Sequence, residues 1–296
     1  MDVMRVGIVD VGSNTVRLLV ADVRGGEVVT VHEERAFLGL GAEVLRHNRI
    51  RRRKLHEVAE ATERFAAEAR RLGARALETV VTAPGRQGAS SDALVATLAR
   101  ATDAPVRVAT AIEEGQLAFV GALSRAGVAE GIVAVCDVGG GSTEIVVGSP
   151  LLGPAWTRSV DIGSLRLTAA LLLDDPPTAA QLDRARAEIE GGFAELEPPR
   201  PELALATGGS ARAIAKLVGG SYGRAELECV IGELVSRPAE ATAAAIGVEV
   251  ERARSLAAGA LILEHVSGLL AVAFTPARGG IREGAALALA AQRAAA

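Results

Sequence analysis

The residues best suited to chemistry lie between Asp137 and Glu144, in the segment DVGGGSTE. Apolar runs rich in β-branched residues stand on both sides, a pattern that predicts a strand, a turn and a second strand. The three consecutive glycines lack Cβ atoms, so their backbone N–H groups can converge on an anion at close range. Ser142 and Thr143 add hydroxyl donors. We expect this turn to bind phosphate; the alternative is a tight hairpin whose glycines only supply positive φ.

An acid stands at the mouth of this turn. Asp137 ends the first predicted strand, so the strand delivers its carboxylate beside the expected phosphate. A carboxylate next to bound phosphate needs a cation between the two charges, and oxygen ligands favour Mg²⁺. The segment therefore predicts a magnesium-dependent phosphate site.

The chain begins with a reduced form of the same pattern. The segment DVGSNT, residues 10–15, again follows one apolar strand and precedes another. Two similar units in one chain indicate an internal duplication with a ligand between the halves. A third turn of glycine and hydroxyl residues, ATGGS at residues 206–210, joins a strand to a helix whose N-terminus can receive an anion.

Two further charged positions could contact such a ligand. Arg86 follows the predicted strand Thr79–Thr82 and lies in the turn after it. Ligands of open α/β sheets bind at such strand ends, so Arg86 could contact the ligand. The alternative is a surface arginine without a functional role. Glu113 and Glu114 open the helix that comes after Pro105. The helix dipole accounts for one acid there, and a pair leaves one carboxylate to spare.

A basic run precedes the long helix predicted by the apolar spacing of Leu55–Ala69. A helix N-terminus normally favours acids, yet this one begins with a row of cations. The run is either a solvated face or a landing surface for an extended polyanion. Its candidate residues are Arg49, Arg51, Arg52, Arg53 and Lys54.

Composition limits the class of protein and its partners. The length of 296 residues suffices for two domains, and an apolar fraction of 49% with only 2% aromatic residues favours a helix-rich α/β protein. A net charge of −4 gives no overall reason to bind nucleic acid or a membrane. Two cysteines and the absence of a signal-like N-terminus predict a cytoplasmic protein without disulfides.

Six segments, in their order and spacing, resemble the exopolyphosphatase / guanosine pentaphosphate phosphohydrolase (Ppx/GppA) family: DVGSNTVRLLV, EEGQLAFVGAL, DVGGGSTEIVVG, VDIGSLRLT, ATGGSARAIA and GGIREG. The resemblance runs from Val6 to about Leu289 and implies a short member without an appended hydrolase domain. It implies the duplicated actin-like, ribonuclease-H-like α/β fold with a phosphate-binding cleft between two domains. We expect these domains at 1–120 and 121–296, with a final helix near 282–296 that packs back on the first domain.

The resemblance also implies a reaction and its residues. The reaction is hydrolytic release of the terminal phosphate of inorganic polyphosphate by an in-line water, with Glu114 as the base and Arg86 as a catalytic clamp. Asp10, Asp137 and Glu144 are the expected ligands of Mg²⁺, with Mn²⁺ as an alternative and a monovalent cation as a second candidate. The expected phosphate-binding residues are Gly12, Ser13, Asn14, Thr15, Gly139, Gly140, Gly141, Ser142, Thr143, Gly208, Gly209 and Ser210. By the same analogy the protein is a homodimer linked to the stringent response.

The chain departs from the family pattern at positions that bear on substrate choice and on contacts of the second domain. At four positions this chain lacks the acid or asparagine that is usual in the family, and at one place it has two additional residues. The substituted positions are Gln87, Ser90, Arg254 and Arg278, and the inserted ones are Pro84 and Gly85. The expected base and the central glycine turn are intact, which argues for an active enzyme.

Three alternative functions stay open at this point. A guanosine pentaphosphate phosphohydrolase is the nearest, although the few aromatic residues offer little for stacking guanine. An actin-like sugar or acid kinase would need an adenosine pocket and an acceptor pocket, and no segment demands either. A non-catalytic sensor of polyphosphate or alarmone is motivated by Gln87 and Arg254.

Overall fold

A computed structural model describes residues 3–89 and 91–295 and shows two compact units. Unit 1 comprises the chain up to Gly127 and again from Gly279 onward, and unit 2 comprises Val128–Arg278. The boundary expected at residue 120 falls inside a helix, α5 (Ala111–Leu123), which lies wholly in unit 1. The chain therefore leaves unit 1 only after this helix has ended.

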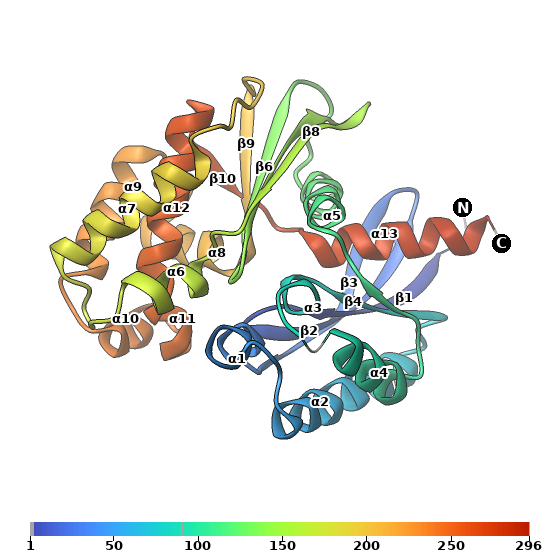
Figure 1. Ribbon diagram of the computed structural model, residues 1–296. Helices are drawn as coiled ribbons and strands as arrows, with labels where there is room; N and C mark the ends of the chain where they lie inside the picture. The colour runs from blue at the N-terminus through green and yellow to red at the C-terminus, as the bar shows by residue number, and fades with distance from the viewer. Residues whose placement is uncertain (1–2, 90, 296) are drawn as a thin grey trace. The chain divides into compact units, whose positions relative to one another are not determined.

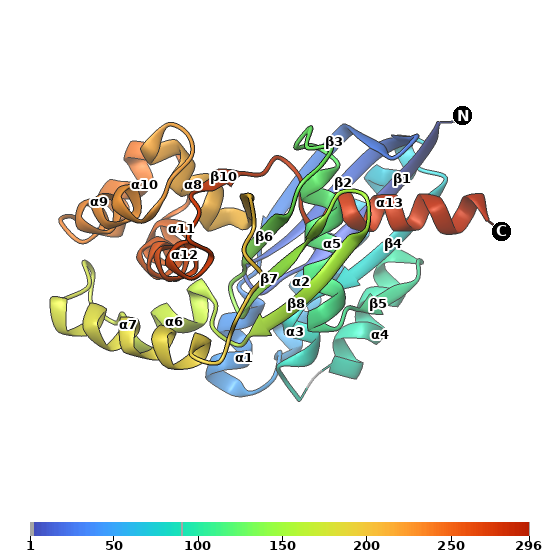
Figure 2. The ribbon, with the colours of Figure 1, turned by 90° about the horizontal axis from the view of Figure 1, so that it is seen from above.

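Unit 1 is built on a five-stranded sheet in the order β3-β2-β1-β4-β5; Figure 1 labels β1 to β4, and Figure 2 labels all five strands. β1 and β2 form an antiparallel hairpin, β3 extends it at one edge, and β4 and β5 run parallel to β1. The central strands are nearly continuous apolar runs because both of their faces are covered. The strands are β1 Met4–Val11, β2 Thr15–Arg24, β3 Glu27–Phe37, β4 Ala76–Val81 and β5 Val106–Val108.

Helices cover both faces of the unit 1 sheet. On one face, α2 (Arg52–Arg71) and α4 (Ser91–Thr102) bury Phe65 and Leu98 completely. On the other face, α13 (Ile281–Ala294) contributes small apolar side chains to a cluster with β1 and β2. The last helix of the chain thus completes the core of unit 1. Two shorter helices are α1 (Leu40–His47) and α3 (Ala83–Arg86).

The contact of α5 with α13 depends on glycine. A Cβ atom at Gly121 would lie 1.9 Å from the Gly280 carbonyl oxygen, and one at Gly284 would lie 2.0 Å from the Leu117 carbonyl oxygen. Only residues without a side chain allow helices to approach this closely. The segment GGIREG therefore has a packing function in unit 1.

Unit 2 repeats the sheet, in the order β10-β9-β6-β7-β8, with β6, β7 and β8 side by side (Figure 2). β6 and β7 form the antiparallel hairpin, β8 is the added edge strand, and β9 and β10 run parallel to β6. Strand for strand this is the order of unit 1, which confirms the predicted duplication. The strands are β6 Val133–Val138, β7 Thr143–Ser149, β8 Gly153–Val160, β9 Leu203–Thr207 and β10 Phe274–Pro276.

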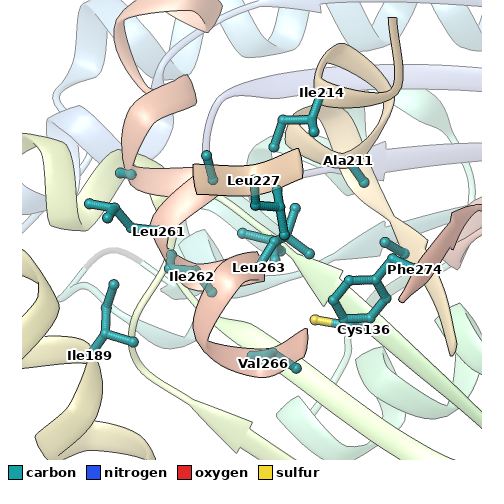
Figure 3. Close-up of a cluster of buried hydrophobic side chains, with 14 of the residues drawn as sticks. Cys136, Ile189, Ala211, Ile214, Leu227, Leu261, Ile262, Leu263, Val266 and Phe274 are labelled. Carbon is teal, nitrogen blue, oxygen red and sulfur yellow. The ribbon is translucent and has the colours of Figure 1, made fainter. Parts of the chain in front are cut away.

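A helical block provides the core of unit 2. Its central member, α12, is apolar on nearly every side and packs with β6, β9 and β10 side chains around Cys136 and Phe274 (Figure 3). A helix that is apolar all round belongs in the interior, which explains the low polarity of GALILEHVSGLL. The helices are α6 Ser164–Leu171, α7 Ala179–Phe193, α8 Gly208–Val218, α9 Arg224–Leu234, α10 Ala239–Ile246, α11 Val250–Arg254 and α12 Leu256–Leu270.

Three local features differ from the sequence-based expectation or limit it. The turn expected at Arg86 contains the short helix α3, and a helix not foreseen, α1, begins at Leu40 in the segment FLGLGAEVL. Ser90, one of the family departures, lies outside the described residues, and Ser91 is the first residue of α4. Within the described residues, no helix combines the length and apolarity needed to cross a membrane.

Candidate active site

The glycine turn of unit 2 is fixed through its carbonyl groups. The Gly139 carbonyl accepts a hydrogen bond from the Ser164 N–H at 2.9 Å, and the Gly140 carbonyl accepts from the N–H groups of Leu165 and Arg166 at 3.0 and 2.9 Å. These donors are the first N–H groups of α6, which have no partner within their own helix. The carbonyl groups of the turn and the first N–H groups of α6 thus satisfy each other's hydrogen bonds.

This docking determines where the N–H groups of the turn point. A trans peptide directs its C=O and its N–H to opposite sides. Because the Gly139 and Gly140 carbonyls point at α6, the N–H groups of Gly140 and Gly141 point away from it. The approach requires a glycine at the start of α6, since a Cβ at Gly163 would lie 2.5 Å from the Ser142 nitrogen.

The turn of unit 1 is fixed in the same way by a different helix. The Ser13 carbonyl accepts from the Gly41 N–H at 2.7 Å, and the Asn14 carbonyl accepts from the N–H groups of Leu38 and Gly39 at 3.1 and 3.0 Å. These donors lie at the N-terminus of α1, so the unforeseen helix holds the expected phosphate turn. The N–H groups of Asn14 and Thr15 correspondingly point away from α1.

The acids of the two hairpins occupy the same register but face different partners. In unit 2 Asp137 stands directly opposite Glu144, and both are buried, with 7% and 1% of their surface exposed. In unit 1 Asp10 stands directly opposite Arg17. Like charges directly opposite each other repel, so the two acids of unit 2 favour a bound cation. In unit 1 the Arg17 guanidinium already supplies a positive charge opposite Asp10.

The residues of the unit 2 hairpin fit Mg²⁺. Asp137 and Glu144 both offer carboxylate oxygens, the ligands that this ion prefers. The Ser159 hydroxyl donates to Glu144 Oε1 at 2.8 Å and orients it, as an outer hydrogen bond does for many metal-binding carboxylates. The pKa of the neighbouring Cys136 thiol is raised, mainly by burial and then by the negative charges of Asp137 and Glu144. Asp10, the third expected ligand, belongs to unit 1.

The N-terminus of α8 brings the third turn to the same acid. Gly208 has φ +91°, and a Cβ atom there would lie 2.8 Å from Asp137 Oδ1 and 2.9 Å from the Val138 carbonyl oxygen. Within the described residues, the buried hydroxyls of Thr207 and Ser210 have no hydrogen-bond partner. Buried hydroxyls normally find a partner, so this helix N-terminus is suited to a ligand that accepts hydrogen bonds.

An arginine that the sequence did not reveal lies against this turn. A Cβ atom at Gly209 would lie 2.5 Å from the guanidinium carbon of Arg252 in α11, so this guanidinium lies directly against the glycine. Guanidinium groups bind phosphate with paired hydrogen bonds. Because Arg252 is distant in sequence and carries no local motif, spacing could not indicate it. Arg254, two residues later, instead donates hydrogen bonds to the carbonyls of Leu172 and Leu173, the two residues that follow α6.

The structure separates the roles of the two acids that open α5. Glu113 completes a capping box: its side chain accepts from the Thr110 N–H at 2.8 Å, a bond that holds the pKa of this carboxyl below its ordinary value. Glu114 is 5% exposed and its Oε2 lies 2.7 Å from Arg86 Nη1. Arg86 also donates to the Ala109 carbonyl at 2.8 Å. Glu113 is the cap, and Glu114 is the spare carboxylate, held by the expected clamp residue.

The basic run is partly neutralised. Arg51 forms a paired contact with Glu43, and both Arg53 and Lys54 contact Glu57. The Arg51 guanidinium lowers the pKa of Glu43 to about 2. Arg49 and Arg52 are exposed and, among the described residues, have no acidic partner. The landing surface expected from the sequence is therefore weaker than its row of cations indicates.

Comparison with known proteins finds relatives over most of the chain. A sequence profile described as the Ppx/GppA phosphatase family matches residues 19–292. Exopolyphosphatase 1 of Mycobacterium leprae is 30% identical over 88% of this chain and 82% of its own length. A guanosine-5'-triphosphate,3'-diphosphate pyrophosphatase of Vibrio campbellii is 26% identical over 64% of this chain and 37% of its own length. The crystal structure of the Aquifex aeolicus member of the Ppx/GppA family superposes with a TM-score of 0.84, at 23% identity and 99% coverage of both chains.

Proposed function

The chain belongs to the Ppx/GppA phosphatase family, with its duplicated actin-like fold, and we propose that within this family it is an exopolyphosphatase. It releases the terminal orthophosphate of inorganic polyphosphate by attack of water. The observation that carries this proposal is the buried Glu114 carboxylate, fixed by Arg86 at 2.7 Å and distinct from the acid that caps the helix. Structural stability gives no reason to bury a second acid there, because an unpaired carboxylate is costly and a paired one gains little.

Each unit supplies a different part of the machinery. In unit 1, Glu114 orients the attacking water and accepts its proton, and Arg86 holds the carboxylate in position. In unit 2, the N–H groups of Gly140 and Gly141 and the first turn of α8 stabilise the charge that develops on the phosphate oxygens. Arg252 adds a guanidinium at Gly209.

Asp137 and Glu144 are the residues of this chain that hold the metal. When bound, Mg²⁺ supplies neutralisation of charge at the phosphate oxygens. Ser159 keeps Glu144 in place through its hydroxyl, and Asp137 lies close to the N-terminus of α8, where its charge is stabilised by the helix dipole. Asp137 thus belongs to the proposed metal site and also lies beside the phosphate-binding turn at the start of α8.

Phosphate release from long-chain polyphosphate, with and without Mg²⁺, tests the proposal. We expect the wild type to release phosphate only with the metal. Glu114→Gln should lower kcat by about 10²–10⁴-fold, the usual contribution of a general base. Glu113→Gln is the matched control, since it removes the neighbouring carboxylate while the glutamine side chain can still complete the capping box, as Gln181 does at Thr178. Equal kcat values for the two variants, or no release by the wild type, would overturn the proposal.

A guanosine pentaphosphate phosphohydrolase is the second candidate, supported by the similarity to the Vibrio campbellii enzyme. The chain contains 1 Trp, 1 Tyr and 5 Phe, and the largest buried aromatic side chains lie in the cores, so few remain to stack guanine. A higher kcat/KM on guanosine pentaphosphate than on polyphosphate would make this the main activity. The homodimer, the cytoplasmic location and the link to the stringent response stay predictions.

A further inference from the structure

A second group of metal-ligating side chains lies in unit 1, away from its phosphate turn in sequence. His32 and Glu34 belong to the edge strand β3, and Glu68 belongs to α2. One ligand atom from each of the three lies within 4.8 Å of the others. Within the described residues, this is the only group of three such side chains that meets that distance.

The fold positions these side chains on one face of the sheet. Residues two apart on a strand point to the same side, and His32 and Glu34 stand opposite Val20 and Leu18 in β2. Those two apolar side chains belong to the core beneath α2, so this is the face that α2 covers. His32 Nε2 and Glu34 Oε1 form a hydrogen bond of 3.1 Å, so these two ligand atoms already lie at about the separation of neighbouring ligands on one ion.

Two arginines of α2 contact the carboxylates from outside. Arg71 binds both oxygens of Glu68 through Nε and Nη2, at 2.7 and 2.6 Å, and Arg64 Nε lies 3.6 Å from Glu34 Oε2. An ionised carboxylate has about four lone-pair positions, so a guanidinium on one side leaves others for a metal. Outer hydrogen bonds of this kind orient the ligands of natural metal sites. About a third or less of each ligand side chain is exposed, at 32% for His32, 31% for Glu34 and 20% for Glu68.

We propose that His32, Glu34 and Glu68 bind one divalent transition-metal ion of the Zn²⁺ class. One imidazole with two carboxylates suits Zn²⁺, Fe²⁺, Mn²⁺ or Co²⁺, whereas Mg²⁺ prefers oxygen alone. This ion is separate from the magnesium proposed for Asp137 and Glu144. It ties the edge strand β3 to α2 through side chains of both elements.

Zinc titration of the untagged full chain tests the site. The titration is done with excess Mg²⁺, in the wild type and in an Asp137→Asn background, so that zinc taken by the magnesium site is not counted. We expect one zinc per chain in both. His32→Ala should remove that equivalent, with a loss of affinity beyond the roughly 10–100-fold that loss of an outer partner causes. His56→Ala is the matched control, because His56 lies on α2, the helix that carries Glu68, and pairs with Glu60 on an open surface.

A spectroscopic readout makes the result independent of stability. The chain has 4 histidines, so imidazole nitrogen NMR signals can be assigned by single substitutions. Substoichiometric zinc should shift the Nε2 signal of His32 before those of His47, His56 and His265, and Glu34→Gln should abolish that preference. Equal shifts of all four signals, or one zinc retained by His32→Ala and Glu34→Gln alike, would overturn the proposal.

Discussion

The two units contain the same sheet and the same hairpin, yet they place different chemistry at the turn. In unit 2 the acid after the first strand faces another acid, and in unit 1 it faces an arginine. The turn of unit 2 has three glycines, while the turn of unit 1 has Ser13 and Asn14 in the corresponding place. A duplicated scaffold can thus keep its hydrogen bonds and change the charge that it presents.

The helix that follows the fourth strand of each sheet differs as well. In unit 2, β9 runs directly into the long helix α8, whose first turn approaches Asp137. In unit 1, β4 runs into the short helix α3, whose last residue is Arg86. The anion-binding N-terminus therefore belongs to unit 2, and the carboxylate with its positioning arginine belongs to unit 1.

Replacing the two hairpin acids should give the largest difference between the units. We expect Asp137→Asn to lower kcat by about 10²–10³-fold, the typical cost of one preorganised electrostatic group, and to raise the Mg²⁺ concentration needed. Asp10→Asn should cost less, since Asp10 faces Arg17 and not a second carboxylate. Kinetics over a magnesium series measure both; equal losses would contradict this difference between the two hairpins.

Gly208→Ala should damage the turn that only unit 2 has. Its φ of +91° and the Val138 carbonyl oxygen, which would lie 2.9 Å from an added Cβ atom, both oppose a side chain, at a cost of about 1–3 kcal/mol in unfolding free energy. We expect activity to fall with it, because Asp137 must move. Gly219→Ala is the control: it has φ +83° at the other end of α8 but open space around it. Urea unfolding and phosphate release should separate the two, and matching activities would contradict the assigned role.

Arg17→Gln should test the charge that unit 1 carries in place of Glu144. If the guanidinium contacts substrate phosphate, its loss costs a charge-assisted hydrogen bond of about 1.5–3 kcal/mol, seen as a rise in KM of about 10–100-fold with a smaller change in kcat. Arg24→Gln, at the exposed end of the same strand, should leave KM unchanged. A fall in kcat with constant KM would place Arg17 with the carboxylates instead.

Glu43→Gln should have the smallest effect on the free energy of unfolding, and it tests the ion pair between Glu43 and Arg51 of the basic run. The pKa of Glu43 is lowered from 4.5 to about 2 in the folded state, so its ion pair with Arg51 stabilises the fold above the ordinary carboxyl pKa. That contribution is lost as the pH falls from 4.5 towards 2. The loss should stay below about 1 kcal/mol because Arg51 is half exposed. Urea midpoints at two pH values should therefore differ more for the wild type than for the variant.

The sequence by itself determined the repeated hairpins and their acids. Alternation and glycine content are local properties, so DVGSNT and DVGGGSTE could be identified as strand, turn, strand units without knowledge of the fold. The capping box at Thr178, with Gln181 in the third helical position, likewise follows from neighbouring residues. The same local signal left the roles of Glu113 and Glu114 undivided, because both acids suit a helix N-terminus.

Only the tertiary structure decided which groups face each other. It assigned Glu113 to the cap and Glu114 to Arg86, and it brought Arg252 to Gly209 and Glu68 to His32. The partners in the last three of these contacts lie tens of residues apart, and no sequence period relates them. Contacts of this kind depend on how helices pack on a sheet, which is fixed by the summed burial of many side chains and not by any single motif.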